Sequence, residues 1–416
     1  MNSKTADRPV VLTEYDSAPI QLNADQECVL RRLARGRITI LPGDAVNTWR
    51  ITTSSYVGTI VTPDVRILIR PKVATANLFY LLEASGKPLD IGHAVFDYDK
   101  TRDLIPSFAT FYARHLEKAL GQGVPRAYEE VQERLPGIRG RVDLPAQLRL
   151  AGVPVPVECR FDEYTADTRL NRVLRGAAIR LLRLPGVTMP TRQALQRLVG
   201  LLDEAGPFRP GDLHTPVVFT RLNEHCRPAE RLARMVLVNE TLHDSTGASG
   251  AGAFLIDMNT AFEEFVAARL SNYLAGRLSV CAQRTQWLDI TKSVKIRPDL
   301  VFKRSAGEIV YVADTKYKIT PDGFGRDADY YQILAYASAL NVPEGMLIYC
   351  QRDGGVPPGE IEVGRLRARI VTWALGLSGT PNDVEHRLRE LARQIVNRIE
   401  SRKQWEIDAG SLRPDG

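Results

Sequence analysis

Residues 293–318, SVKIRPDLVFKRSAGEIVYVADTKYK, are the stretch that decides the fold of this chain. They are typical of two short strands joined by a tight turn, because apolar runs lie on both sides of the Arg-Ser-Ala-Gly cluster at residues 304–307. Residues 309–315 are rich in β-branched side chains and tyrosine, as strands inside a sheet are. The stretch therefore predicts a hairpin of two neighbouring strands.

Charged side chains end this otherwise apolar hairpin. Side chains alternate between the two faces of a strand, so Asp314 and Lys316 project to the same side. If Arg297 pairs with Asp314, then Asp299 lies opposite Val312 on that same face, within diagonal reach of Asp314. Such charges are costly at the end of a buried strand unless they have partners or a task. We therefore expect two acids and a lysine to converge on one point.

These groups are the ones that metal-assisted hydrolysis of a phosphodiester needs. Mg²⁺ prefers hard oxygen ligands and keeps several waters, so Asp299, Asp314 and the carbonyl oxygen of Thr315 suffice to hold it against a phosphate. Lys316 then stabilises the charge that develops on the phosphate or orients the attacking water. The segments Pro298-Asp299 and Asp314-Thr315-Lys316 resemble the PD-(D/E)xK nuclease signature. A surface hairpin with an ordinary ion pair is the alternative interpretation.

Two predicted helices flank the hairpin. After it, DADYYQILAYASAL holds Gln332 and Tyr336 four positions apart, hence on one helical face. This pair resembles the Gln-x-x-x-Tyr element of RecB-like nucleases, which would place an amide and a phenol beside the metal or the DNA. Before the hairpin, DMNTAFEEFVAARLSNYL carries Glu263 at the border of its apolar stripe, with Glu264 as the solvated alternative. Both helices are also compatible with plain packing against the sheet.

Length and composition restrict the class of protein. With 416 residues, 44% hydrophobic and 25% charged, the chain is expected to form two or three globular domains. The net charge of +6 is compatible with a polyanionic partner and equally with many other enzymes. The five cysteines form no CxxC pair, and no P-loop occurs, which argues against a zinc knuckle, a disulfide scaffold and nucleotide binding of that type. Without a signal-like start or a long apolar run, a cytoplasmic protein without membrane contact is expected.

The order of the patterns suggests a division of the chain. Residues 1–150 are predicted to form an N-terminal domain that is β-rich at first and then helical. Residues 151–416 are predicted to form an α/β domain of the restriction-endonuclease type, with a helical insert at 164–245 and a nuclease core at 254–405. Within the first region, the segment Arg139-Gly140-Arg141 has a glycine that allows close approach to a phosphate. A turn whose arginines face water explains this segment equally well.

Several motifs in chain order resemble the McrC family, the nuclease subunits of McrBC-type, modification-dependent restriction systems. They are GTIVTPDVRILIRPKV, GIRGRVDL, CRFDEYTADTRLNRVL, FLIDMNTAFEEFV, IRPDLVF, ADTKYK and YYQILAYA. The resemblance covers most of the chain. It implies that Asp299, Asp314 and Lys316 are catalytic, with Glu263 and Gln332 as auxiliaries and Mg²⁺ as the cofactor.

The resemblance also implies partners. A separate McrB-like AAA+ GTPase hexamer would recognise double-stranded DNA carrying 5-methylcytosine, while the N-terminal region of this chain would dock on it and stimulate GTP hydrolysis. Arg139, Arg141 and Tyr336 are candidates for contact with DNA or the partner. Two other interpretations stay open. One is a stand-alone RecB-like repair nuclease, and the other is a non-catalytic regulatory subunit of a motor complex.

Overall fold

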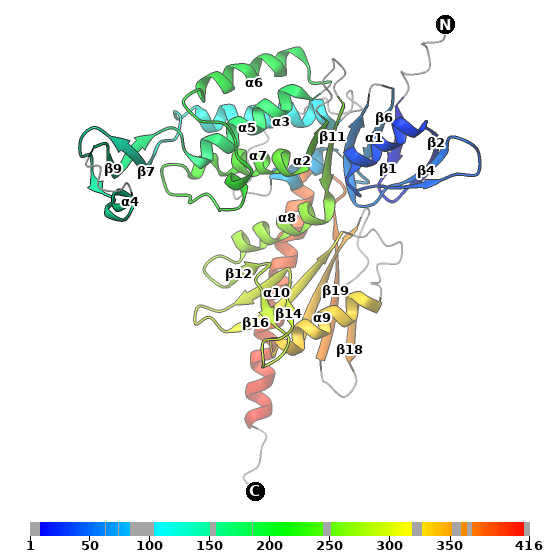
Figure 1. Cartoon of the computed structure of the whole chain (residues 1–416). Coiled ribbons are helices and arrows are strands. Elements are labelled where there is room, and N and C mark those ends of the chain that lie inside the picture. Colours follow the sequence, from blue (N-terminus) through cyan, green and yellow to red (C-terminus); the bar gives the residue numbers. More distant parts are fainter. Residues whose placement is uncertain are drawn as a thin grey trace. The chain divides into compact units, whose positions relative to one another are not determined.

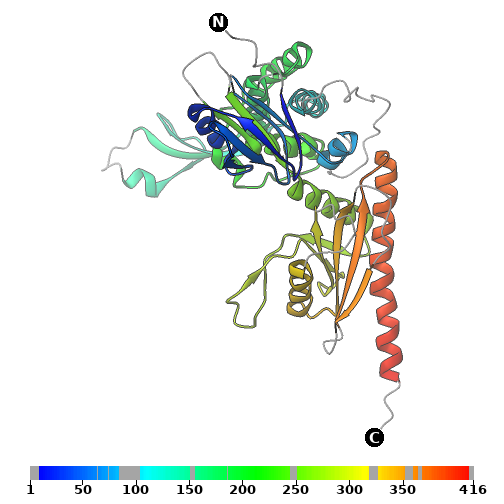
Figure 2. The same ribbon diagram turned by 90° about the vertical axis from the view of Figure 1, so that its right-hand side faces the viewer.

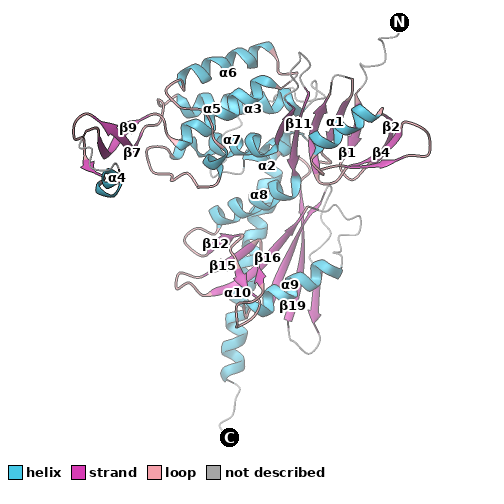
Figure 3. Ribbon diagram, viewed as in Figure 1, coloured by secondary structure: helices cyan, strands magenta, loops and turns pink. Residues whose placement is uncertain are grey.

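The computed structural model describes residues 9–62, 64–73, 75–83, 104–149, 155–184, 186–243, 251–317, 327–351, 359–363 and 368–411 (Figure 1). The contacts group the chain into two compact units, each containing helices and strands (Figure 3). Unit 1 combines Met1–Gly58, Arg66–Arg102 and Leu255–Gly416, and unit 2 combines Thr59–Val65 and Asp103–Phe254. Unit 1 thus draws on both ends of the chain. The ranges 1–150 and 151–416 stay a prediction about functional regions.

The N-terminal part of unit 1 is rich in strands. β1 runs parallel to β6, whereas β2, β4 and β3 form a separate antiparallel sheet in that order. Helix α1 begins after Asn23, because the side chains of Asn23 and Gln26 each accept a hydrogen bond from the other's backbone N–H. The elements of this part are β1 (Val10–Thr13), β2 (Ser17–Gln21), α1 (Ala24–Ala34), β3 (Thr39–Pro42), β4 (Thr48–Thr52), β5 (Tyr56–Val61), β6 (Arg66–Arg70) and α2 (Thr75–Glu83).

The C-terminal part of unit 1 contains a six-stranded sheet with the order β12-β15-β16-β17-β19-β18. The three strands β16, β17 and β19 are parallel, and the other neighbours in this sheet are antiparallel. The elements are α8 (Met258–Tyr273), β12 (Ser279–Ala282), β13 (Gln286–Trp287), β14 (Lys295–Ile296), β15 (Leu300–Lys303), β16 (Ile309–Lys316), α9 (Asp327–Ala339), β17 (Glu344–Gln351), β18 (Gly359–Val363), β19 (Ala368–Gly376) and α10 (Pro381–Ser411).

Helices cover both faces of this sheet. α9 packs on one face, against β16, β17 and β19, and the long helix α10 packs on the other, against β19 and α8 (Figure 2). Parallel strands covered on both faces are apolar on both faces, which explains why the interior of β17 is buried without alternation. Burial of these side chains fixes the positions of the strand ends, where the charged residues lie.

The hairpin of β15 and β16 forms as expected, but the expected register is wrong. Leu300 pairs with Ala313, which places Asp299 across from Asp314 rather than from Val312. The difference is two residues, because the turn is longer than expected and the register shifts once more near it, in β15. Since side chains alternate with a period of two, a shift of two residues leaves each of them on its predicted face. The acids therefore still converge.

Unit 2 combines a group of helices with a β arm. α5 packs against α6 and α7, and α3 packs against α6 and α7. The β arm, residues 127–165, consists of the long antiparallel pair β7 and β9 with the short strand β8 beside β9. The elements are α3 (Leu104–Leu120), β7 (Ala127–Leu135), β8 (Arg141–Val142), α4 (Leu144–Leu148), β9 (Val157–Thr165), α5 (Arg169–Arg183), α6 (Met189–Leu201), η1 (Pro210–Leu213), η2 (Glu224–Cys226), α7 (Arg227–Asn239), β10 (Glu240–His243) and β11 (Ala251–Asp257), the last of which crosses into unit 1.

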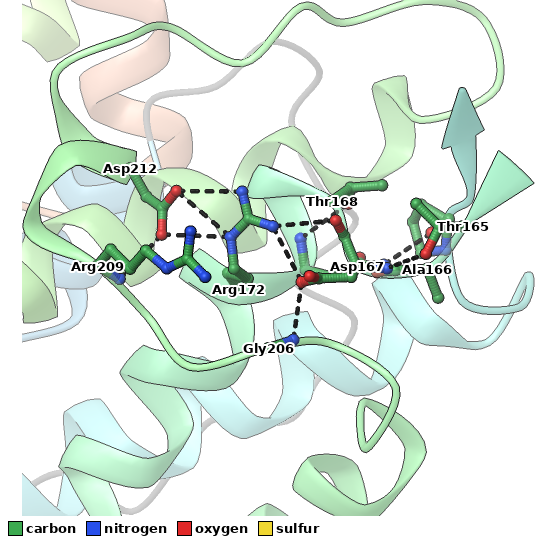
Figure 4. Close-up of polar contacts among 10 residues, drawn as sticks. Thr165, Ala166, Asp167, Thr168, Arg172, Gly206, Arg209 and Asp212 are labelled. Atoms are coloured by element: carbon green, nitrogen blue, oxygen red, sulfur yellow. Dashed lines mark hydrogen bonds and ion pairs between the residues drawn. The ribbon is translucent and has the colours of Figure 1, made fainter. Parts of the chain in front are cut away.

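An arginine joins the start of α5 to the loop after α6 (Figure 4). Arg172 donates to Asp167 at 2.9 Å and to Asp212 at 3.3 Å, and the Asp167 carboxylate also accepts from the backbone of Gly206 at 2.8 Å. Thr168 caps the helix by accepting a hydrogen bond from the Asn171 N–H. The two carboxylate partners of Arg172 make it a structural residue.

Candidate active site

The predicted catalytic residues come together at the ends of two neighbouring strands of unit 1. Asp299 directly precedes β15, and Asp314 and Lys316 lie in the last three residues of β16. The Asp314 side chain is almost fully buried, with the residue 1% exposed, and its Oδ2 lies 2.5 Å from Nζ of Lys316. This ion pair is shielded from water on the protein side, so its electrostatic interactions are stronger than those of a surface pair.

Thr315 fixes the position of the Asp299 carboxylate. Oδ2 of Asp299 accepts one hydrogen bond from the backbone N–H of Thr315 at 2.8 Å and another from its hydroxyl at 2.9 Å. The backbone of Thr315 is itself held by pairing of β16 with β17, opposite Ile348. A carboxylate held by a strand backbone has little freedom to rotate, which is the preorganisation that a reactive site requires.

Helix α9 holds the lysine. Lys316 Nζ donates to Oε1 of Gln332 at 2.9 Å, and Nε2 of Gln332 donates to the hydroxyl of Tyr336 at 2.8 Å. The hydroxyl of Tyr336 in turn lies 3.5 Å from the carbonyl oxygen of Arg297, two residues before Asp299. The predicted pair on one face of α9 therefore connects the lysine on one strand to the segment that carries the first aspartate.

Helix α8 contributes Glu263 to the same site. Its carboxylate accepts a hydrogen bond from Nε2 of Gln283, and the side-chain oxygen of Gln283 accepts from Arg297 at 2.5 Å. Arg297 also donates to the backbone carbonyl of Gln283 at 3.0 Å. Gln283 was not anticipated, because a single glutamine in a loop carries no sequence signal. It links the helix of Glu263 to the strand of Asp299.

Asp314 and Glu263 have raised pKa values. Burial, followed by the neighbouring charge of Asp299, raises the pKa of Asp314 to about 7. Burial and the same neighbour raise the pKa of Glu263 to about 7. For Lys316, burial alone would lower the pKa, but the neighbouring negative charges, above all that of Asp314, together outweigh burial and raise it. Carboxylates that repel one another in a buried site are typical of a place that receives a cation.

The donor atoms fit a Mg²⁺ ion. Asp299 and Asp314 supply two carboxylates, and the buried Oδ2 of Asp314 has no hydrogen bond of good geometry despite its ion pair with Lys316. Within the described residues, no group of three His, Cys, Asp or Glu side chains is arranged as a complete metal cage. Mg²⁺ does not require one, because it usually binds through one or two carboxylates and retains waters.

The residue after Lys316 is tied to the first strands of the chain. The hydroxyl of Tyr317 donates to Oε1 of Glu14 at 3.1 Å, and the hydroxyl of Tyr15 lies 3.4 Å from the Tyr317 carbonyl. Oε1 of Glu14 also accepts from the backbone N–H of Lys72 at 2.9 Å. Burial raises the pKa of Glu14 to about 7. Sequence reasoning missed this contact between distant parts of the chain.

Arg139 and Arg141 belong to unit 2 and lie in the β arm. Together with the neighbouring residues of β7 and β9, they line a concavity of about 410 Å³. The guanidinium of Arg139 stacks on the ring of Phe161 at 3.9 Å and lies 3.4 Å from Glu163. Arg141 is exposed and lies opposite Arg160 in the neighbouring strand β9. Their role in contacting DNA or a partner stays a prediction.

Comparison with known proteins identifies the family. Residues 51–350 match the model of the family described as McrBC 5-methylcytosine restriction system component. This chain belongs to the McrBC family. The membership that the sequence motifs suggested is therefore confirmed. No curated protein matches the chain.

One solved structure supports the fold of this McrBC family member. One similar chain belongs to the refined half-complex from a tetradecameric assembly of Thermococcus gammatolerans McrB AAA+ hexamers with bound McrC. The two chains are 19% identical, the match covers 93% of this chain and 100% of that one, and the TM-score is 0.54. This similarity confirms the predicted α/β fold. A match to the Thermococcus gammatolerans McrBC complex has 21% identity, covers 64% of this chain and 88% of that one, and has a TM-score of 0.38. No helix of the described residues is long and apolar enough to cross a membrane.

Proposed function

We propose that this member of the McrBC family is a nuclease subunit that hydrolyses phosphodiester bonds in double-stranded DNA with Mg²⁺. One observation carries the proposal. Asp299, Asp314 and Lys316 meet at the ends of two paired strands, and each is held by a partner of its own rather than facing open solvent. An ordinary surface ion pair would not bury its acid or fix its lysine from a separate helix.

The roles of the residues follow from their surroundings. Asp299, Asp314 and the carbonyl oxygen of Thr315 would hold Mg²⁺, which when bound activates water and neutralises charge on the phosphate. Lys316, oriented by Gln332, would donate to a phosphate oxygen as its negative charge grows. Glu263, whose pKa is about 7, is suited to accept a proton from water near neutral pH. Tyr336 would keep Gln332 in its orientation and lie close to the DNA.

We further propose that the chain works with an AAA+ GTPase of the McrB type in the cytoplasm. Support comes from the family, and from the similar solved chain, which is described as McrC bound to McrB AAA+ hexamers. The β arm is the candidate contact, because Arg139 and Arg141 lie on it and large apolar side chains at its end are exposed, among them Ile138 and Leu148. Recognition of 5-methylcytosine would belong to the assembled system, as the family description indicates.

The test is cleavage of plasmid DNA by the full chain with Mg²⁺. It is run with methylated and unmethylated plasmid, and with or without GTP and an AAA+ GTPase of the McrB type. Asp314→Ala removes a proposed metal ligand and leaves Lys316 without its carboxylate partner, so the rate should fall at least about 100-fold. Asp203→Ala, a change at an exposed position in unit 2, is the matched control and should cut normally.

The outcomes separate this proposal from its alternatives. Cutting that requires the partner, GTP and methylation supports a restriction subunit. Cutting of unmethylated DNA by the chain alone supports a stand-alone repair nuclease instead. Failure of the unaltered chain to cut, combined with stimulation of the partner's GTPase, supports a regulatory subunit. Retained cutting by Asp314→Ala contradicts the assignment of the active site.

A further inference from the structure

A small hairpin projects from the sheet immediately before Asp299. It comprises residues 283–297, with β13 and β14 as its strands, and it stands out from the body of the sheet (Figure 2). We call it the entry hairpin. Trp287 pairs with Lys295 across it, and the backbone N–H of Leu288 donates to Val294 at 2.9 Å. The polypeptide then runs through Arg297 and Pro298 directly into the first carboxylate of the site.

The tip of the entry hairpin exposes apolar side chains. Ile290 is 101% exposed, and Leu288 and Val294 are 43% and 47% exposed. Single exposed apolar residues are common on protein surfaces, but three on one projecting hairpin expose more apolar area than a solvated loop normally does. The arrangement indicates a surface that another molecule covers.

The tip is rigid despite its exposure. The carboxylate of Asp289 accepts hydrogen bonds from the backbone of Ser293 at 2.9 Å and of Val294 at 2.8 Å, and from the hydroxyls of Ser293 and Thr291. Lys292 adopts a left-handed backbone conformation, with φ of 58°. A loop fixed in this way loses little conformational entropy when it binds, so it is preorganised for a ligand.

The charge of the entry hairpin identifies that ligand. Residues 283–297 carry four cations and one acid, and the acid, Asp289, is occupied by the hydrogen bonds of the tip. All four cations are exposed, namely Arg284, Lys292, Lys295 and Arg297, and Nζ of Lys295 lies 5.6 Å from the centre of the Trp287 ring. Lysines around an exposed apolar tip suit double-stranded DNA. The lysines can bind the backbone phosphates, and the apolar side chain can enter the groove between the two DNA strands.

We propose that the entry hairpin is a DNA-contacting element, in which Lys292 and Lys295 bind backbone phosphates and Ile290 enters the groove beside the scissile bond. The inference rests on the proposed nuclease function, because the element is placed by its continuity with Asp299. At no more than about 3.3 Å per residue, the nine residues from Ile290 to Asp299 span at most about 30 Å, which corresponds to about nine base pairs. The contact therefore lies within one helical turn of the cleaved phosphate.

The base of the hairpin connects this contact to the active site. Arg297 donates to Gln283 at the opposite side of the base, and Gln283 donates to Glu263. The carbonyl of Arg297 also faces the hydroxyl of Tyr336. DNA bound on the entry hairpin is thereby held in register with both α8 and α9, the two helices that position Glu263 and Lys316.

The test measures binding of a fluorescent 30-base-pair duplex by anisotropy, over a range of salt concentrations. All proteins carry Asp314→Ala, so that the probe is not cut. Lys292→Ala with Lys295→Ala should lower the slope of log K against log salt by about 1.8, or about 0.9 for each lost phosphate contact. Ile290→Ala should weaken binding about tenfold without changing the slope, because it removes an apolar contact.

A matched control removes two exposed cations elsewhere. Lys118→Ala with Arg183→Ala changes the net charge equally and should leave the slope unchanged. If both hairpin variants bind DNA with the affinity and slope of the Asp314→Ala parent, the inference is overturned. Weaker assembly with the AAA+ partner without loss of DNA binding would overturn it as well. Absence of duplex binding by the parent protein would overturn it too. Failure of the proposed function is recognised separately, since it requires that Asp314→Ala still cuts plasmid.

Discussion

Replacing Glu14 with glutamine tests whether the N-terminal strands contribute a buried carboxylate to the C-terminal part of unit 1. Glu14 is 0% exposed, and burial raises its pKa from 4.5 to about 7. A raised folded-state pKa means that the native protein binds the proton more tightly than the unfolded chain does. The stability this provides is complete below pH 4.5 and is lost as the pH rises to about 7.

The magnitude follows from the size of that shift. A difference of about 2.5 pKa units corresponds to about 3 kcal/mol, of which about 2.5 kcal/mol is lost between pH 5 and pH 8. Glutamine keeps an oxygen that can accept from Lys72 and Tyr317. Its amide nitrogen replaces Oε2 of Glu14, a buried atom that has no hydrogen-bond partner, and leaving that amide unpaired costs about 1 kcal/mol.

Thermal unfolding between pH 5 and pH 8 measures the difference. We expect Glu14→Gln to be slightly less stable than the unaltered protein at pH 5 and more stable at pH 8, with a crossing between them. For a unit of this size, the gain at pH 8 corresponds to a few degrees in Tm. Glu362→Gln, a change at an exposed position of the same unit, serves as the control. An identical pH dependence in all three proteins would refute the reasoning.

Two further substitutions test the site and the β arm. Gln332→Leu removes the acceptor that holds Lys316, so the rate of plasmid cleavage should fall about 10- to 100-fold. Gln332→Glu keeps an acceptor and should retain more activity. Equal rates in Gln332→Leu and the unaltered protein would show that α9 does not position the lysine. Gly140→Ala places a Cβ 2.6 Å from Cβ of Phe161 at a residue with φ of 69°, so it should destabilise the β arm by about 1 to 3 kcal/mol and make it more sensitive to protease. Gly137→Ala is the control, because its Cβ meets no atom within 4 Å. Equal proteolysis of both variants would contradict the strain argument.

The hairpin that carries the site was predictable because it depends on local patterns. Alternation along a strand places Asp314 and Lys316 on one face whatever the rest of the fold does. Helical spacing brings Gln332 next to Tyr336 in the same way. The pairing of the two strands was misjudged by two residues, because turn length and a local register shift do not show in hydrophobicity. Because the difference is an even number of residues, the side chains of the site still lie on the predicted face.

Contacts between distant segments could not be predicted. Nothing near Glu14 indicates that it meets Tyr317, since a glutamate after a short strand is usually exposed. Gln283 joins Glu263 and Arg297 only because its loop lies beside helix α8. Arg172 pairs with Asp212, 40 positions away, which no local pattern indicates. Each case depends on tertiary packing, which local propensity does not contain.

Unit 1 is built from both ends of the chain, and this affects its folding during synthesis on the ribosome. Glu14 and Tyr317 are separated by 303 positions, and Asn77 and Leu377, whose carbonyl accepts from the Asn77 side chain, by 300. At about 5 to 20 residues per second, the first strands wait about 15 to 60 s for their partners to be translated. During that time the whole of unit 2 has emerged and can fold. The strands around Glu14 are therefore the part of the nascent protein with the greatest need of a chaperone.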